Sequence, residues 1–326
     1  MKKKLSERCE RKMMNVKKKI LTVSSANMDF VMNIQKLPVA GQTLSDPGTY
    51  AFVPGGKGAN SAVTVSRLGG ASVFCTRLGN DANGERLRSI YLNEGIDPRF
   101  IFTDPDTATG LASIMVEPSG QNRIIVFPGS NARICEKDVS AALLCRPDAL
   151  LMHLEIPRQT VLATAGLAAS KNIPIVLDAG PADPSFPLEQ LPELCVFSPN
   201  ETETKVFTGI YPDSPDTCLT ASIALARRVR AKYYVIKLGE RGCYVYDGKY
   251  YSCVPGYSVP AIDTTAAGDV FTAALTLEYL RSGDIVRAAR FGNIAGALSV
   301  CVSGALPSLP TSAAVEDFME KKGIRL

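Results

Sequence analysis

The sequence lacks tryptophan, contains a single histidine, His153, and has only 7% aromatic residues. A surface of stacked aromatic side chains for nucleic acid is therefore not expected. His153 lies in the apolar run 150–154, a context typical of a buried structural histidine, and the chain has no Gly-x-Ser-x-Gly motif to pair with it. These absences argue against nucleic-acid binding and against serine hydrolase chemistry.

Long apolar runs are also absent, since no stretch approaches the roughly 18 residues that a membrane-spanning helix needs. The apolar segment 20–23 is too short for a secretory signal and runs into polar residues. The nine cysteines are odd in number and form no Cys-x-x-Cys pair, which favours free thiols over a disulfide framework or a zinc site. The sequence thus predicts a cytoplasmic protein that does not act on a membrane.

Charge of one sign is concentrated only at the start of the chain. The net charge is +4, and residues 1–19 carry nine lysines or arginines against two glutamates, so the rest of the chain is slightly acidic. A basic body that grips phosphate backbones is therefore not indicated. We expect residues 1–18 to form a basic, disordered leader, in which Met13 and Met14 offer alternative translation starts.

What the sequence does contain is a regular alternation of short apolar runs and amphipathic stretches. The apolar runs predict buried strands at 20–25, 72–77, 149–154, 173–178, 194–197 and 233–237. The amphipathic stretches predict helices at 58–68, 83–93, 137–144, 159–170, 201–208, 219–229, 266–280 and 285–300. This alternation predicts an α/β fold with a parallel sheet and helices on both of its faces.

Two segments, at about 30–53 and 107–128, break the alternation because they hold strand-like pieces without helices between them. We expect antiparallel strands that leave the main sheet together as a flap. A flap over a cleft would exclude water from a reaction, whereas the plainer alternative is a simple extension of the sheet.

The first candidate motif is the segment 55–60, which reads GGKGAN and opens a helix at Gly58. Three glycines in four residues allow the backbone to approach a ligand closely, and Lys57 and Asn60 add a cation and an amide. The segment lacks the serine or threonine of a Walker A loop, and Ser61 stands where a dinucleotide fingerprint has its third glycine. A ligand-binding loop and a plain glycine turn both remain open.

The second motif is the segment 263–271, DTTAAGDVF, at another junction of a loop and a helix. The small residues at 266–268 leave their N–H groups bare at a helix N-terminus, which is a ready anion site. Asp269 in the first turn is either a helix cap or a base that takes a proton from a hydroxyl. A carboxylate beside an anion site favours the second role, in phosphoryl transfer.

Two weaker motifs follow buried strands. Asn200 and Glu203 offer oxygen ligands of the kind that suit Mg²⁺, usually through water. The same Asn-x-x-Glu spacing is that of a capping box, and spacing alone favours the cap. The loop 237–242, KLGERG, is in a position to lie beneath a nucleotide, although many hairpins share this pattern.

Together, the segments 55–60 and 263–269 resemble the two signatures of the PfkB (ribokinase-like) family of carbohydrate kinases. The resemblance spans about residues 18–320 and extends to the segments 27–29, 129–132, 154–155, 199–203 and 238–242. It implies that residues 19–326 form a ribokinase-like three-layer sandwich with a mainly parallel central sheet and a small β-sheet lid. It also implies ATP-dependent phosphorylation of a sugar hydroxyl, and the motifs resemble most those of family members that act on the 5-hydroxyl of D-ribose.

The resemblance assigns roles residue by residue. Asp269 would be the general base, and the backbone amides of Ala266, Ala267 and Gly268 would form the anion hole. The sugar would be bound by Asn27, Asp29, Gly56, Lys57, Gly58, Asn60, Glu155 and Asp269. The nucleotide, with hydrated Mg²⁺ near the first two residues, would be bound by Asn200, Glu203, Lys237, Gly239, Gly242, Gly268 and Asn293. A monovalent cation such as K⁺ would be bound by Asp263, Thr265, Ser299, Val302, Gly304 and Ser308. An exposed lid strand would pair with a second subunit to give a homodimer.

The sequence departs from the family pattern in three places. Ala266 replaces the most common glycine, the run 177–181 (LDAGP) differs from the usual Asn-Pro-Ala-Pro, and Val302 stands where a long polar residue often occurs. The remaining alternatives are a related kinase for a nucleoside, fructose or a keto-deoxy sugar acid, and a catalytically silent sugar sensor whose basic leader binds nucleic acid.

Overall fold

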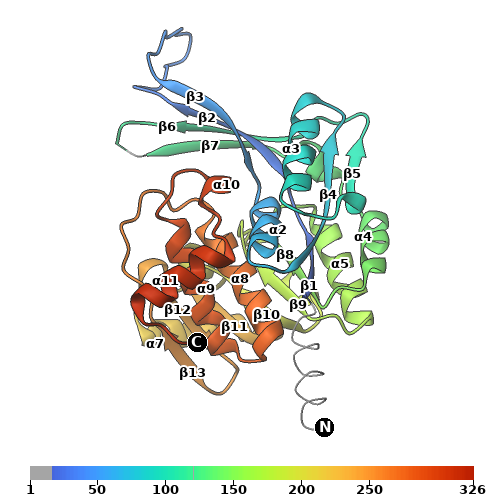
Figure 1. Ribbon diagram of the computed structural model, residues 1–326, viewed down its shortest axis with the longest axis vertical. Helices are drawn as coiled ribbons and strands as arrows, with labels where there is room; N and C mark the ends of the chain where they lie inside the picture. The colour runs from blue at the N-terminus through green and yellow to red at the C-terminus, as the bar shows by residue number, and fades with distance from the viewer. Residues whose placement is uncertain (1–16, 120) are drawn as a thin grey trace, which may run out of the picture.

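The computed structural model describes residues 17–119 and 121–326, so nearly all of the expected leader at 1–18 lies outside the described residues. Within this part of the chain the strands form one nine-stranded sheet and one four-stranded sheet (Figure 1). The strand order in the large sheet is β13-β12-β11-β10-β9-β8-β1-β4-β5. The fold is therefore the expected α/β sandwich with a second, smaller sheet.

The large sheet is built from short apolar runs that are buried on both faces. Ile20 packs into the core on one face of the sheet, whereas Leu21 and Val23 pack into the core on the other. The six strands predicted from apolar runs are all present, with small shifts at their ends. The strands are β1 (Lys19–Val23), β4 (Ala71–Gly79), β5 (Ile101–Asp104), β8 (Ala149–Met152), β9 (Ile175–Asp178), β10 (Leu194–Ser198), β11 (Ala231–Lys237), β12 (Cys243–Tyr246) and β13 (Tyr251–Val254).

One edge of the large sheet is antiparallel, so the sheet is mainly parallel, as expected. The strands from β11 to β5 pair in parallel, but β12 pairs antiparallel with β11, and β13 pairs antiparallel with β12. The reason lies in the connections, because a parallel crossover needs about a dozen residues and the loop between β11 and β12 is far shorter.

Helices cover both faces of the large sheet. One core contains residues of α2, α3, α8, α9 and α11, and the other contains residues of α4, α5, α6 and α7. The short α10 contacts α2 and β3. The helices are α2 (Lys57–Arg67), α3 (Ala82–Asn93), α4 (Glu136–Ala142), α5 (Arg158–Ser170), α6 (Glu201–Thr208), α7 (Pro215–Ala226), α8 (Ala267–Ser282), α9 (Ile285–Ser299), α10 (Ala305–Ser308) and α11 (Ser312–Lys322).

The four-stranded sheet, which we call the lid, extends across one end of the molecule (Figure 1). Its order is β3-β2-β6-β7, with β2 at Asn27–Asn33, β3 at Thr49–Gly55, β6 at Gly110–Val116 and β7 at Asn122–Phe127. The expected antiparallel pairing holds for β2 with β3 and for β6 with β7. It is wrong for the central pair, because β2 and β6 run in parallel.

The C-terminal ends of the parallel strands gather the motif residues. Asn27 follows β1, His153 follows β8, Asn200 follows β10, and Asp178 and Lys237 are the last residues of β9 and β11. This edge of an open α/β sheet is where ligands bind. Among residues 17–119 and 121–326, no helix has the length and apolar character needed to cross a bilayer.

Candidate active site

The two glycine-containing motifs meet through Asp269. This residue lies in the first turn of α8 and is 4% exposed. The side-chain amide of Asn60 on α2 donates a hydrogen bond to its Oδ2 at 2.8 Å, and the Nζ of Lys57 lies 3.5 Å from its Oδ1. Asn60 and Asp269 are 209 residues apart in the sequence. The carboxylate of Asp269 is thus held from the side of the first motif.

Lys57 also balances the other carboxylates of the site. Its pKa is raised above the ordinary value, mainly by Asp269 and further by Asp178, Glu155 and Glu203, which together outweigh the opposing effect of burial. The lysine is therefore a fixed positive charge beside Asp269.

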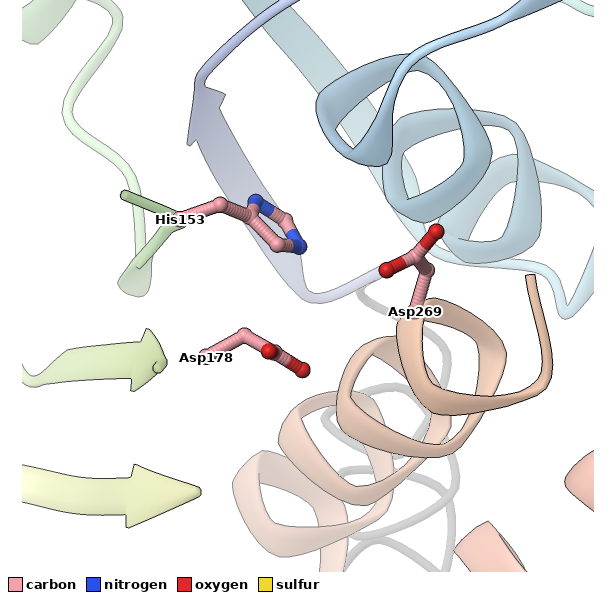
Figure 2. A group of neighbouring side chains, drawn as sticks. All are labelled: His153, Asp178 and Asp269. Carbon is pink, nitrogen blue, oxygen red and sulfur yellow. The ribbon is translucent and has the colours of Figure 1, made fainter. Parts of the chain in front are cut away.

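Asp269 also belongs to a buried cluster with His153 and Asp178 (Figure 2). One ring nitrogen of His153 and one carboxylate oxygen of each aspartate lie within 4.8 Å of one another. The expectation of a buried histidine is confirmed, because His153 is fully buried and its Nε2 lies 3.1 Å from the Ser61 hydroxyl. Its Nδ1 has no hydrogen-bond partner among the described residues. Burial lowers the pKa of His153, which keeps the ring neutral.

The N-terminus of α8 has the geometry expected of an anion site. Ala266, the N-cap residue, has φ +65°, and the helix begins at Ala267. The left-handed conformation costs an alanine roughly 1–2 kcal/mol, so the surrounding structure must stabilise it. Gly268 faces the Lys237 ammonium, because a Cβ placed on it would lie 3.5 Å from Nζ. The amide of Ala267 makes only a long contact, 3.3 Å, with the Thr264 carbonyl.

A group of polar side chains, which we call the polar cluster, lies between β2 and the loop after β8 and includes Asn27, Asp29 and Glu155. Glu155 accepts hydrogen bonds at Oε2 from the Ser25 hydroxyl and, at 3.1 Å, from the Lys57 backbone amide. Asn27 accepts a hydrogen bond of 2.7 Å from the side chain of Asn131. These bonds fix the orientations of Glu155 and Asn27 before any ligand arrives.

Asp29 in β2 is the member of the polar cluster whose carboxyl group lacks a hydrogen-bond partner at Oδ1 among the described residues. This oxygen is buried. Burial, reinforced by the nearby charge of Glu155, raises the pKa of Asp29 to about 7. An unsatisfied buried acceptor of this kind is suited to bind a hydroxyl group.

Glycines allow the N-terminus of α2 to lie close to the polar cluster. Gly56 has φ +93°, and a Cβ on Gly58 would lie 2.5 Å from the Cβ of Ser24 and 2.7 Å from the carbonyl oxygen of Ser25. The N-terminus of α2 therefore packs directly on the segment that follows β1, which brings Lys57 and Asn60 to Asp269.

A cavity of about 520 Å³ lies beside the first turns of α8. It is lined by Lys237, Gly239, Gly242, Gly268 and Asn293, five of the seven residues that the resemblance assigns to the nucleotide, and by the apolar residues Tyr257, Val259, Phe271, Ala297 and Val300. The amide group of Asn293 donates to the carbonyls of Val254 and Pro255, at 3.1 and 3.0 Å, so it positions the cavity wall.

The comparisons with known proteins agree with this geometry. The family described as pfkB family carbohydrate kinase matches residues 17–312. The chain belongs to the PfkB family of carbohydrate kinases.

Relatives of this PfkB-family chain include two kinds of pentose kinase. The ribokinase of Haemophilus influenzae is 33% identical over 308 residues, which cover 94% of this chain and 99% of that protein. The deoxyribokinase of Salmonella typhi is 27% identical over 303 residues, which cover 92% of this chain and 97% of that protein. The solved structure of Arabidopsis thaliana ribokinase complexed with ribose and ATP has a TM-score of 0.85 and 28% identity, covering 94% of this chain and 99% of that one.

In this PfkB-family chain the Asn-x-x-Glu motif forms the capping box that its spacing also predicts. The Asn200 side chain accepts a hydrogen bond from the Glu203 amide at 2.8 Å, and Glu203 Oε2 accepts one from the Asn200 amide at 2.7 Å. The other oxygen, Oε1, faces Gly180, on which a Cβ would lie 2.4 Å away. Burial raises the pKa of Glu203, with the like charge of Asp178 contributing. A cation beside this carboxylate would offset that cost, so the donor set fits hydrated Mg²⁺.

The residues predicted for a monovalent cation gather around the loop before α8 and the end of α9. Asp263 accepts hydrogen bonds from the Thr265 hydroxyl at 2.6 Å and from the Gly304 amide at 2.8 Å. Burial opposes the ionisation of Asp263, but these bonds outweigh it and lower the pKa of the carboxyl group. Ser308 donates its amide to the Gly304 carbonyl at 3.3 Å, and the amide of Val302 lies 3.4 Å from the Ser299 carbonyl. Carbonyl and carboxylate oxygens of this kind suit K⁺.

Sequence reasoning missed several residues that shape the site. Asp178 is 1% exposed and forms an ion pair with Lys237, and Thr272 on α8 donates to the same carboxylate at 2.6 Å. Ser25 and Asn131 orient Glu155 and Asn27. The sequence signal for Asp178 was its departure from the family pattern, and Asn131 lies in the segment 129–132 that belongs to the resemblance, although no role was assigned to it.

Proposed function

We propose that this chain phosphorylates D-ribose at its 5-hydroxyl with ATP, giving ribose 5-phosphate and ADP. The observation that carries the proposal is the position of Asp269. It lies in the first turn of α8, where it contacts Lys57 and Asn60, and it directly follows Gly268, which lines the cavity. Membership of the PfkB family and the similarity to ribokinases support it.

The donors and acceptors of the polar cluster suit a polyol. We assign Asn27, Asp29, Glu155, Lys57 and Asn60 to the sugar hydroxyls, with Gly56 and Gly58 giving the backbone close access. Asp29 and Glu155 provide acceptors, and Lys57 and Asn60 provide donors. Because the Asn27 and Glu155 side chains are already held by other residues, little side-chain entropy is lost when the sugar binds.

Asp269 acts as the general base. The sugar hydroxyl oxygen attacks the γ-phosphorus in line, its proton passes to the Asp269 carboxylate, and the bond from phosphorus to the bridging oxygen of ADP breaks. The amides of Ala266, Ala267 and Gly268 at the start of α8 face the charge that develops on the phosphoryl oxygens.

We assign the two cation roles to the groups described above. Asn200 and Glu203 hold hydrated Mg²⁺ which, when bound with ATP, neutralises charge on the phosphate oxygens. Asp263 and Gly304, with Thr265, Ser299, Val302 and Ser308, form the K⁺ site. This loop leads directly into Ala266 and α8, so a cation there supports the left-handed conformation of Ala266 and with it the anion hole.

We also propose that the chain acts as a homodimer formed through the lid. β7 is an edge strand whose residues are all exposed, and edge strands with apolar side chains tend to pair. We place the reaction in the cytoplasm, because the eight cysteines within the described residues are free thiols.

The first experiment measures turnover across a panel of acceptors: D-ribose, 2-deoxy-D-ribose, D-fructose, a nucleoside and a keto-deoxy sugar acid. ADP and sugar phosphate are quantified directly by chromatography, with K⁺ present or replaced by tetramethylammonium at constant ionic strength. We expect the highest kcat/KM with D-ribose and a higher rate with K⁺. A higher kcat/KM with another acceptor would contradict the ribose assignment, and no turnover with any acceptor would contradict the kinase.

The second experiment tests the base. Asp269→Asn keeps the size of the side chain but removes its basicity, so kcat should fall by about 10²–10⁴ while ATP still binds. Asp317→Asn is the matched control, because Asp317 lies in an exposed ion pair on α11 and its loss should leave kcat unchanged. Turnover of Asp269→Asn within tenfold of wild type refutes the base role.

A further inference from the structure

The end of β11 carries a buried ammonium group that the family signatures do not include. Lys237 is the last residue of β11 and is 8% exposed. Its Nζ forms an ion pair with Asp178, the last residue of β9, and reaches across β10 to do so. Thr272 on α8 completes the group, because its hydroxyl donates to Asp178 at 2.6 Å and lies 3.5 Å from Nζ of Lys237. Three elements thus fix the position of one ammonium.

This ammonium lies beside the proposed anion hole. A Cβ on Gly268 would lie 3.5 Å from Nζ, so Lys237 contacts the first turn of α8. Lys237 and Gly268 both line the 520 Å³ cavity. The Nζ of Lys57 lies within 3.5 Å of the carboxylate of Asp269. Lys57 therefore contacts Asp269 itself, and Lys237 lies against the preceding residue, Gly268, on the side of the cavity.

Burial of Lys237 without a counter-charge would be costly, and Asp178 removes that cost. Burial alone raises the pKa of Asp178, but the Lys237 ammonium, with a smaller effect of Lys57, more than reverses this and holds the pKa below its ordinary value. The Asp178 carboxyl group is therefore ionised before any nucleotide binds. A purely structural pair would not need to be placed at the wall of the cavity, beside the helix N-terminus.

We propose that Lys237 is a catalytic residue that contacts the transferring phosphoryl group, and that Asp178 and Thr272 are positioning residues that hold its ammonium. The inference rests on the proposed kinase function. While the new oxygen–phosphorus bond forms and the bond to ADP breaks, negative charge spreads over the phosphoryl oxygens and the leaving oxygen. Lys237 keeps its protons throughout, since Asp269 takes the proton of the hydroxyl. Its contribution is a fixed positive charge that favours the transition state.

The experiment compares Lys237→Met, Asp178→Asn and the double variant with wild type. Lys237→Met removes the ammonium, and kcat should fall by about 10²–10³, as on loss of one preorganised donor, with KM for the sugar changed little. Because Lys237→Met leaves Asp178 buried without its partner, that variant is also expected to be destabilised. The double variant replaces both charges with neutral groups, so it should recover stability and keep the low kcat.

A positioning role of Asp178 predicts non-additive effects. Asp178→Asn alone should lower kcat by about tenfold to a hundredfold, because a slightly misplaced ammonium loses much of its effect. In the Lys237→Met background the same substitution should cause no further fall in kcat. The control pair is Glu278→Gln with Arg287→Met, which removes another partly buried ion pair farther along α8 and should leave kcat unchanged.

Binding measurements separate stabilisation of the transition state from ordinary nucleotide binding. In the double variant, inhibition by ADP with aluminium fluoride, Mg²⁺ and sugar should weaken by the same factor as kcat, whereas the affinity for a non-hydrolysable ATP analogue should change less than fivefold. A double variant with kcat within tenfold of wild type, or equal losses for the two nucleotide complexes, overturns the inference. No turnover by the wild-type enzyme overturns the proposed function and this inference with it, whereas wild-type turnover beside an unaffected double variant overturns this inference alone.

Discussion

If Asp29 binds the sugar as proposed, its side chain makes sugar binding depend on the pH of the solution. Its pKa is raised to about 7 by burial and by Glu155, so it is largely protonated below pH 7 and ionised above. Hydroxyl groups that donate to the carboxylate stabilise its ionised form, and ribose binding therefore favours loss of the proton. Affinity for the sugar should rise as the pH rises through 7.

We therefore expect KM for D-ribose to fall several-fold between pH 6 and pH 8, measured at saturating ATP. In Asp29→Asn the pH dependence of KM should disappear, and KM at pH 8 should rise about tenfold or more, because a hydrogen bond to a charged group is worth roughly 1.5–3 kcal/mol. If the Asp29→Asn variant keeps the pH dependence of the wild-type enzyme, a group other than Asp29 causes the pH dependence of KM.

Which side chains could be predicted from the sequence depends on whether a contiguous motif carries them. Lys57, Asn60 and Asp269 belong to two short segments whose residue types predict a ligand site without a structure. In the structure the side chains of Lys57 and Asn60 both contact that of Asp269. Asp178 and Lys237 are 59 residues apart and end two strands that have β10 between them. Their pairing depends on the strand order of the sheet, which apolar runs do not reveal.

Helix α2 is the element that carries the sugar side of the site to Asp269. All of its residues from Gly58 to Val65 are buried, and it packs against β1, β4 and α8. Gly58 lies so close to Ser24 and Ser25 that a methyl group there would overlap both. The position of Lys57 and Asn60 therefore depends on a glycine that makes no contact with substrate through a side chain.

Gly58→Ala should push the start of α2 away from Ser24, lower the free energy of unfolding by about 1–3 kcal/mol and reduce kcat/KM for the sugar. Gly166→Ala is the matched control, since Gly166 lies on the exposed side of α5 with no atom within 4 Å of an added Cβ. That change should raise stability by about 0.5–1 kcal/mol and leave kcat/KM unchanged. Urea denaturation and steady-state kinetics measure both effects, and a Gly58→Ala variant as stable as wild type contradicts the packing argument.

Several elements were displaced or missed by sequence reasoning, for identifiable reasons. Apolar periodicity predicts a helix at 219–229. The corresponding helix, α7, begins at Pro215, where Ser214 and Thr217 form a capping box. Capping and a proline at the first position determine that start, and neither contributes to periodicity. Strands β5 and β13 include polar and exposed residues, so neither shows the continuous buried apolar run that predicted the equally short β8 and β9.

For the molecule as a whole, the lid is the part whose pairing the sequence did not predict. Its central strands β2 and β6 pair in parallel although the whole segment from β3 to β5 separates them. Local turn signals predict the hairpins, whereas this long-range pairing depends on where the main sheet delivers the two strands. The result is a four-stranded sheet with two edges, β3 and β7.

One face of the lid carries exposed apolar side chains. Asp29 and Phe30 are adjacent in β2, so Phe30 projects on the face opposite Asp29. On that face Phe30 stacks on Phe52 with ring centroids 4.7 Å apart, and the register places Ile125 in the same row. Tyr50, Phe52, Ile125 and Phe127 are between 39% and 72% exposed. We call this set the outer lid face.

The proposed homodimer would bury the outer lid face, since contiguous exposed apolar side chains mark association sites and cyclic dimers are the commonest assemblies. Analytical ultracentrifugation should therefore give twice the 34.9 kDa mass of one chain. Ile125→Asp should shift the protein to a monomer, whereas Ile223→Asp, at an exposed isoleucine on α7, should not. Because the lid supplies Asp29, the monomer should also show a raised KM for D-ribose with a smaller change in kcat. An Ile125→Asp variant that stays dimeric would place the interface elsewhere, and the lid would then have to be held over the sugar by its contacts with α10 and the main sheet alone.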